Sequence, residues 1–177
     1  MKKLERARLY YLSSPQLTDD TIRRFLEDNK ATTLHGGKAV NAFLPDYLDK
    51  PTEDWDVIVP NNPKAVAGQL EHLLDTRYEG NFFKVLPSRH TGTYRIISIV
   101  TQRPIADVTL AEGPVPTKIL DGINVATLDF HVKCLKDALA DPRKKFRHRK
   151  DRETLQRINI HKTEQKELPT DLPGLST

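Results

Sequence analysis

Two aspartates separated by a single residue are the first feature of this sequence that could do chemistry. Asp54 and Asp56 flank Trp55, and the β-branched apolar run 57–59 that follows is typical of a buried strand. Because side chains alternate along a strand, both carboxylates are expected on one face, about 7 Å apart, with Trp55 on the other. Two carboxylates so placed repel each other and lose hydration, which predicts a divalent cation between them.

A third aspartate and a glycine pair accompany these acids. Asp107 lies inside the apolar run 104–110, where a charged side chain needs a partner or a metal; an edge strand with Asp107 in water is the alternative. Upstream, Gly36 and Gly37 stand between a predicted strand and a predicted helical turn, where free backbone N–H groups can hold phosphate. Such a pair by itself is more often only a tight turn, so its meaning depends on the acids that follow.

The elements expected around these residues alternate between helices and strands. Helices are predicted at 4–13, from a cap at Thr18, at 39–44, from the cap Asn62-Pro63, at 127–140 and at 146–161. Strands are predicted at 31–34, 53–59, 82–86, 94–100 and 105–110, with a further hairpin over 119–125 turning at Asp121-Gly122. This order predicts the α+β class, with a single mixed or antiparallel sheet flanked by helices and with helices at the C-terminal end.

The bulk composition limits the class of protein. The chain has 177 residues, 37% of them hydrophobic, and predicts one domain over 1–162 with residues 163–177 as a disordered tail. Its mean hydropathy is −0.56, and no apolar run reaches the length of a membrane span or follows the basic N-terminus as a secretory signal would require. Cys134 is the only cysteine, which excludes an internal disulfide and a cysteine-rich zinc site. We therefore expect a cytoplasmic protein with no membrane partner.

Positive charge gathers in one segment. The net charge is only +4, from 28 basic and 24 acidic residues, but the stretch 143–152 holds seven lysines and arginines. Such a cluster can bind phosphate. The alternative is a solvated helix end, where cations are common.

The acidic and glycine motifs together resemble a known catalytic signature. Leu34-His35-Gly36-Gly37, Asp54-Trp55-Asp56-Val57 and then Asp107 are similar to the signature of the polymerase-β-like nucleotidyltransferase superfamily. The loop between Gly37 and Asp54 is longer than the family's common spacing, and Gly37 stands where serine is frequent. The closing helices resemble those of small stand-alone nucleotidyltransferases, including the abortive-infection toxin type.

The resemblance implies a metal-dependent transfer of a nucleotidyl group from a nucleoside triphosphate to an acceptor hydroxyl. Asp54 and Asp56 would ligate two Mg²⁺ or Mn²⁺ ions about 3.5–4 Å apart, and Asp107 would complete the site of the catalytic ion. Gly36 and Gly37 would present N–H groups to the triphosphate. The implied charge partners of the phosphates are Lys38, a helix lysine that is either Lys136 or Lys133, and Lys150 with Asp151.

The acceptor and the biological setting stay open at the level of sequence. A nucleic-acid end, a tRNA, a protein side chain and a small molecule are all used within the superfamily, and the stretch 143–152 favours RNA or DNA. A non-catalytic nucleotide or nucleic-acid binding module is one alternative. A toxin-type subunit of a two-component system, with a protein partner, is another.

Overall fold

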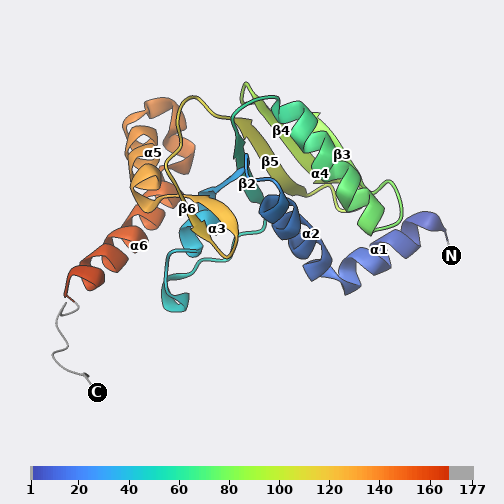
Figure 1. The fold of residues 1–177 in the computed structure, drawn as a ribbon, viewed down its shortest axis with the longest axis horizontal. Helices are drawn as coiled ribbons and strands as arrows, with labels where there is room; N and C mark the ends of the chain where they lie inside the picture. The colour runs from blue at the N-terminus through green and yellow to red at the C-terminus, as the bar shows by residue number, and fades with distance from the viewer. Residues whose placement is uncertain (1, 168–177) are drawn as a thin grey trace, which may run out of the picture.

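Seven strands form one mixed sheet in the computed structural model, which describes residues 2–167 (Figure 1). The strands are β1 (Thr33–His35), β2 (Trp55–Val59), β3 (Phe83–Pro87), β4 (Thr93–Ser98), β5 (Pro104–Leu110), β6 (Thr117–Leu120) and β7 (Ile123–Ala126). The α-helices are α1 (Lys3–Ser13), α2 (Pro15–Asp28), α3 (Gly36–Asn41), α4 (Pro63–Arg77), α5 (Leu128–Ala140) and α6 (His148–Glu167). Two short 3₁₀ helices, η1 (Asp46–Leu48) and η2 (Pro142–Arg147), complete the described elements, and the predicted α+β class with C-terminal helices is confirmed.

The strand order brings the acidic strands to the centre of the sheet. The order is β3-β4-β5-β2-β1-β7-β6, so that β2 pairs with β5 on one side and with β1 on the other. The pairs β2/β5 and β1/β7 are parallel, and the other neighbours are antiparallel. Residues far apart in the chain, from the glycine turn, the acid pair and the third acid, therefore meet on three adjacent strands.

Helices α2 and α4 cover one face of this sheet and build the main core. The two helices lie side by side (Figure 1), with α4 packed on β3, β4 and β5 and α2 packed on β7. Asn62 caps α4 by accepting a hydrogen bond from the backbone N–H of Ala65, and Pro63 occupies the first helical turn, where its missing N–H costs nothing. The buried core side chains include Ile22, Phe25, Leu26, Val57, Val59, Leu70, Leu74, Ile96 and Val108.

The C-terminal helices form a second unit at the other end of the sheet. Figure 1 shows α5 and α6 gathered at the side opposite α1. They pack on α3 through a separate apolar cluster around Val40, Leu44 and the fully buried Ile158. This packing fixes the position of α5 relative to the glycine turn, because Val40 belongs to the helix that the glycines begin.

Three local predictions need correction. Helix α2 begins at Pro15, so Thr18 does not cap it; Thr18 is buried inside the helix, where its hydroxyl lies 2.7 Å from that of Tyr78. The basic stretch is divided between η2 and α6, since Pro142 begins a separate 3₁₀ helix. Helix α6 continues to Glu167, five residues into the predicted tail, and the remainder of that tail lies outside the described residues.

The predicted hairpin over 119–125 is present as β6 and β7. Asp121 and Gly122 both adopt positive φ at its turn, a conformation typical of tight hairpins. Among residues 2–167, none of the helices combines the length and the apolar character that crossing a bilayer requires.

Candidate active site

Four polar side chains form a row across the central strands. Asp56 on β2 is the Cα partner of Asp107 on β5 and of His35 on β1, and Asp107 is in turn the partner of Arg95 on β4. Paired residues on neighbouring strands point to the same face, so the whole row shares one side of the sheet. It is the face opposite α2 and α4, because Trp55 on the helix-covered side is buried and donates its indole N–H to Asp19 at 2.7 Å.

Asp56 is the electrostatic centre of this row. Burial raises the pKa of its carboxyl to about 6, and the negative charges of Asp54 and Asp107 push it in the same direction. Lys150 and Arg147 act in the opposite sense, because their positive charges favour the ionised form. The three acids named from the sequence therefore act on one another, and cations from the C-terminal helices face them.

Asp107 is held by Arg95 in a bidentate ion pair. The Arg95 Nε donates to Oδ1 of Asp107 at 2.7 Å, and Nη2 donates to Oδ2 at 2.6 Å. The Asp107 side chain is 14% exposed, so this pair is shielded from water on the carboxylate side. No local pattern in the sequence predicts this ion pair, because the register that places Arg95 opposite Asp107 depends on the pairing of β4 with β5.

The glycine turn lies directly against the central carboxylate. Gly36 has a φ of 71°, and a Cβ placed on it would lie 2.0 Å from Oδ2 of Asp56. A Cβ on Gly37 would lie 2.5 Å from Cγ2 of Thr52, in the loop that leads to β2. Both glycines are therefore required by close packing, and that packing brings the start of α3 to the side chain of Asp56.

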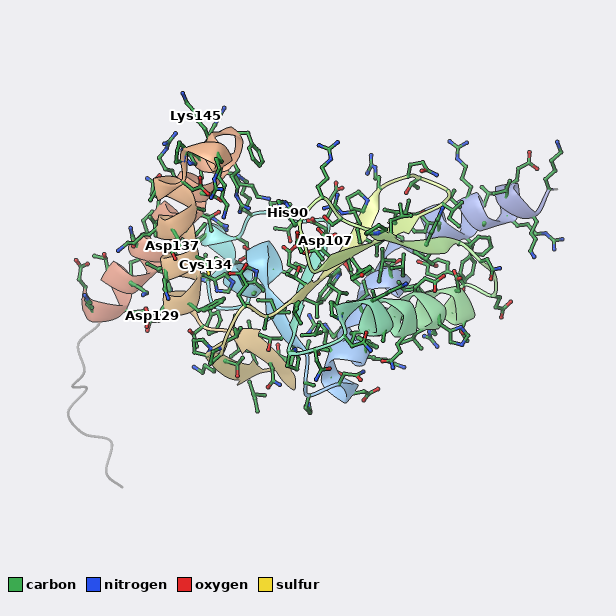
Figure 2. The ribbon with its side chains drawn as sticks, turned by 90° about the horizontal axis from the view of Figure 1, so that it is seen from above. His90, Asp107, Asp129, Cys134, Asp137 and Lys145 are labelled. Atoms are coloured by element: carbon green, nitrogen blue, oxygen red, sulfur yellow. The ribbon has the colours of Figure 1, made fainter. Side chains whose placement is uncertain are left out.

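A cleft of about 270 Å³ opens beside Asp56, between the glycine turn and the C-terminal helices. One helix face contributes residues at the spacing i, i+3, i+4 and i+7, which are His131, Cys134, Leu135 and Ala138. Three cations, Lys144, Arg147 and Lys150, line the same cleft. Figure 2 labels Cys134 on α5, which lines the cleft, and Asp107 in the sheet, which is not among the lining residues.

Two histidines that line the cleft stack on each other. The rings of His35 and His131 stack with centroids 4.7 Å apart. Burial lowers the pKa of His35 to about 4, with the charges of His131 and Arg147 acting in the same direction, and burial also lowers the pKa of His131. Both rings are therefore neutral near pH 7. A positively charged pair at this position would repel the adjacent cations.

The structure separates Lys38 from the acids. Its Nζ donates to the carbonyl of Thr52 at 3.0 Å and lies 4.8 Å from the centre of the Trp55 ring. This is the helix-covered side of β2, where Lys38 lines a larger cavity of about 500 Å³ that contains none of the three acids. Volume alone would favour that cavity, but Asp56 and the glycine turn line the smaller cleft.

The fold also shows which of the predicted helix lysines lines the cleft. Lys133 and Lys136 are both exposed and lie outside the stripe of α5 that faces the cleft, so neither lines it. Lys150 does line it. Asp151 is 1% exposed and accepts hydrogen bonds from Arg147 between 2.9 and 3.1 Å, so that it positions this arginine rather than meeting solvent. The periodic stripe on α5 was the sequence signal that could have separated the lining residues from the two lysines.

The acids do not form a ready-made metal centre. Within the part of the chain that the structure describes, no three His, Cys, Asp or Glu side chains lie close enough together to hold a metal ion as they stand. Both oxygens of Asp107 already accept hydrogen bonds from Arg95. The donor type nevertheless suits a hard cation, because carboxylate oxygens are the ligands that Mg²⁺ and Mn²⁺ prefer.

Comparison with solved structures identifies the fold. The Megavirus polyadenylate synthase matches with a TM-score of 0.61 and 17% sequence identity, over 92% of this chain and 34% of that chain. JHP933 from Helicobacter pylori matches with a TM-score of 0.50 and 14% identity, over 82% of this chain and 66% of that chain. The chain thus spans about one third of the viral protein and just under two thirds of the bacterial one.

The sequence comparisons give no such match. No protein-family model matches the sequence, and no curated protein matches it at a significant level. At identities below one fifth, the structural likeness concerns the arrangement of strands and helices. The chain therefore has the polymerase-β-like nucleotidyltransferase fold, as its glycine and aspartate motifs predict.

Proposed function

We propose that this protein is a metal-dependent nucleotidyltransferase, which moves a nucleotidyl group from a nucleoside triphosphate to an acceptor hydroxyl. The observation that carries the proposal is the placement of Asp56. It pairs in the sheet with Asp107, lies against the glycine turn and lines a cleft whose opposite wall is basic. Carboxylates that could bind a cation and basic side chains that could bind phosphates thus meet at one point of a nucleotidyltransferase fold.

The acids would hold Mg²⁺ or Mn²⁺. Asp54, Asp56 and Asp107 supply carboxylate oxygens. Burial and, after it, the negative charges of Asp54 and Asp107 raise the pKa of Asp56, and a divalent cation would favour the ionised form. When bound, the metal would stabilise the charge that develops on the transferred phosphoryl group and on the leaving pyrophosphate. Asp107 joins this set only if it exchanges the guanidinium of Arg95 for the cation, and its carboxylate then favours deprotonation of the acceptor hydroxyl.

The basic wall would hold the triphosphate. Lys144, Arg147 and Lys150 line the cleft opposite the glycine turn, so a polyphosphate between them would meet cations on one side and backbone N–H groups on the other. Arg147 is already fixed by Asp151, which reduces the entropy lost when it binds phosphate. Gly36 and Gly37 leave space for a close approach to the backbone.

A nucleic-acid acceptor fits the charge distribution best. The stretch 143–152 borders the cleft and carries seven lysines and arginines, which suits a polyanionic acceptor better than a neutral small molecule. Binding of such an acceptor would weaken steeply with added salt.

A non-catalytic nucleotide-binding module is the second candidate, and one observation favours it. Arg95 occupies both oxygens of Asp107, which is compatible with a site that binds nucleotide but has lost its catalytic cation. The two candidates differ in one result. A binding module would bind triphosphates without transferring their nucleotidyl group to any acceptor.

Cys134 offers a direct test of the site. It is the only cysteine, it lines the cleft, and burial raises the pKa of its thiol, so its alkylation is slow enough to time. We would measure its modification rate with each ribonucleoside and deoxyribonucleoside triphosphate, in Mg²⁺, in Mn²⁺ and in chelator. A nucleotide in the cleft is expected to protect the thiol when metal is present, and Asp56→Ala is expected to lose this protection.

Transfer itself is then measured with α-³²P-labelled triphosphates and oligonucleotide acceptors, in wild type and in Asp56→Ala. Metal-dependent labelling that the variant lacks supports the proposed enzyme. Protection without labelling of any acceptor supports the binding module. Absence of both protection and labelling with every triphosphate contradicts a nucleotide site.

A further inference from the structure

An exposed aromatic ring stands at the edge of the basic wall. Phe146 lies in η2, and 83% of its surface is exposed, the highest value among the exposed large hydrophobic residues of the described chain. Single exposed apolar residues are common and need no explanation by themselves. The setting of this one is unusual, because every other residue from 143 to 150 is a lysine, an arginine or a histidine.

Side-chain hydrogen bonds fix both ends of η2, the short helix that carries Phe146. Asp141 caps η2 by accepting from the backbone N–H of Arg143 at 3.0 Å and from its Nε at 2.9 Å. At the other end of η2, Nε2 of His148 lies 3.0 Å from the carbonyl oxygen of Ala138 and 3.1 Å from that of Asp141, so the His148 imidazole donates to these carbonyls. The backbone that carries Phe146 is therefore fixed near both ends of η2, so this segment loses little freedom when a ligand covers the Phe146 ring.

The ring is close to the proposed catalytic cleft. Its neighbours Lys144 and Arg147 line that cleft, and Lys145 projects into solvent from this end of the molecule (Figure 2). Arg149, on the first turn of α6, is also strongly exposed. A chain of phosphates that crosses this end of the molecule would therefore meet cations on both sides of Phe146.

We propose that Phe146 is a stacking platform for an unpaired base of a single-stranded polynucleotide, whose phosphates are held by Lys145 and Arg149. The inference rests on the proposed function, and it names the acceptor class of the same site. Bases offer flat faces to an aromatic ring only where they are not already stacked in a duplex. The cations alone would bind single and double strands alike, so the ring is what distinguishes the two.

A protein partner fits this surface less well. The cores of protein interfaces are depleted in lysine and bury several apolar side chains together. Phe146 has no apolar neighbour in sequence from 143 to 150, and its immediate setting is strongly cationic. Aromatic rings interleaved with lysine and arginine are instead typical of single-strand binding surfaces.

The test is an affinity measurement with a mutated ring. Fluorescein-labelled 12-mers of rA, dA and rU, and a 12-base-pair duplex, would be titrated by fluorescence anisotropy in chelator, so that binding is separated from catalysis. Phe146→Ala is expected to weaken single-strand binding about 5- to 150-fold and to leave duplex binding unchanged. Phe146→Trp is expected to retain the affinity, because indole also stacks. The rA and dA arms show whether the site distinguishes RNA from DNA.

Salt dependence separates stacking from charge. Phe146→Ala is expected to shift the plot of log affinity against log salt without changing its slope, whereas Lys145→Ala reduces the slope by about 0.7. Tyr47→Ala is the matched control, since Tyr47 is an aromatic residue with 68% exposure. It hydrogen-bonds Glu164, which lies about 24 Å along α6 from His148, so its loss is expected to leave affinity unchanged.

The outcomes distinguish this inference from the proposed function. Because the ring is exposed, Phe146→Ala is expected to keep the wild-type melting temperature and the protection of Cys134 by metal and triphosphate. Single-strand affinity that the variant retains in full overturns the inference, as does an equal loss for the duplex. With Cys134 protection intact, such a result leaves the nucleotide site standing and removes only the stacking role of Phe146. Failure of protection in wild type would instead remove the proposed function.

Discussion

Replacing Asp56 with asparagine is expected to stabilise the metal-free protein while removing its activity. The carboxylate of Asp56 is largely buried beside Asp54 and Asp107, which raises its pKa from the usual 3.8 to about 6. Ionisation therefore costs more in the folded state than in the unfolded state. An amide of the same shape carries no charge and avoids this cost.

The magnitude follows from the two pKa values. The interval from 3.8 to about 6 corresponds to roughly 3 kcal/mol, at 1.36 kcal/mol per pKa unit. Because the folded-state pKa is the higher one, the cost appears as the pH rises through about 4 and is complete above about pH 6. For a chain of this size, the gain for Asp56→Asn at pH 7.5 corresponds to an increase in Tm of roughly 6–12 °C.

Calorimetry of both proteins at pH 4 and pH 7.5, in chelator and in 10 mM Mg²⁺, would measure the effect. The gain should be large at pH 7.5 and absent at pH 4, and Mg²⁺ should stabilise wild type more than the variant. Asp137→Asn removes an exposed carboxylate on α5 and is expected to change the stability by less than about 0.5 kcal/mol. A variant that melts at or below the wild-type temperature at pH 7.5, or a gain of equal size at both pH values, would refute this reasoning.

Two further substitutions test the neighbours of this carboxylate. Gly36→Ala places a methyl group 2.0 Å from Oδ2 of Asp56 at a φ of 71°, so we expect a loss of about 2 kcal/mol or more in urea denaturation and loss of transfer activity. Gly113→Ala, where a methyl group meets nothing within 4 Å, is the control, and equal stability of the two variants would contradict the close packing. Arg95→Met frees the carboxylate of Asp107 and is expected to tighten Mn²⁺ binding about tenfold, measured by electron paramagnetic resonance. An unchanged Mn²⁺ affinity would show that the ion pair does not compete with the metal.

Local patterns in the sequence were sufficient for the class of fold and for its central motif. The alternation around Asp56 placed Trp55 on the buried side, and the cap at Asn62 marked the start of α4. The turn at Asp121-Gly122 marked the β6/β7 hairpin. Each of these features depends on residues close together in the chain, where backbone sterics and side-chain periodicity decide the outcome.

The exact start of a helix and the side that it turns toward the sheet were harder to predict from the sequence. Thr18 has the residue type of a cap, but α2 begins at Pro15, four residues before the start that such a cap predicts. Pro15 and a buried partner for the Thr18 hydroxyl, Tyr78, favour the longer helix. Lys133 and Lys136 differ from the cleft residues of α5 only in the side of the helix on which they lie. Which side faces the sheet is decided by the packing of α5 on α3 and α6, and this depends on residues more than a hundred positions apart, such as Val40 and Ile158.

The sequence alone was therefore enough to select the three aspartates and the glycine pair as candidate site residues, since residue types and spacing are local properties of the chain. The tertiary structure decided which groups meet them. The register of β4 on β5 brings Arg95 to Asp107. A hydrogen bond to the carbonyl of Thr52, in the loop before β2, holds Lys38 on the helix-covered face of the sheet, away from the three acids. Strand register and helix orientation are set by burial of the whole core, so the spacing of residues within one segment cannot predict them.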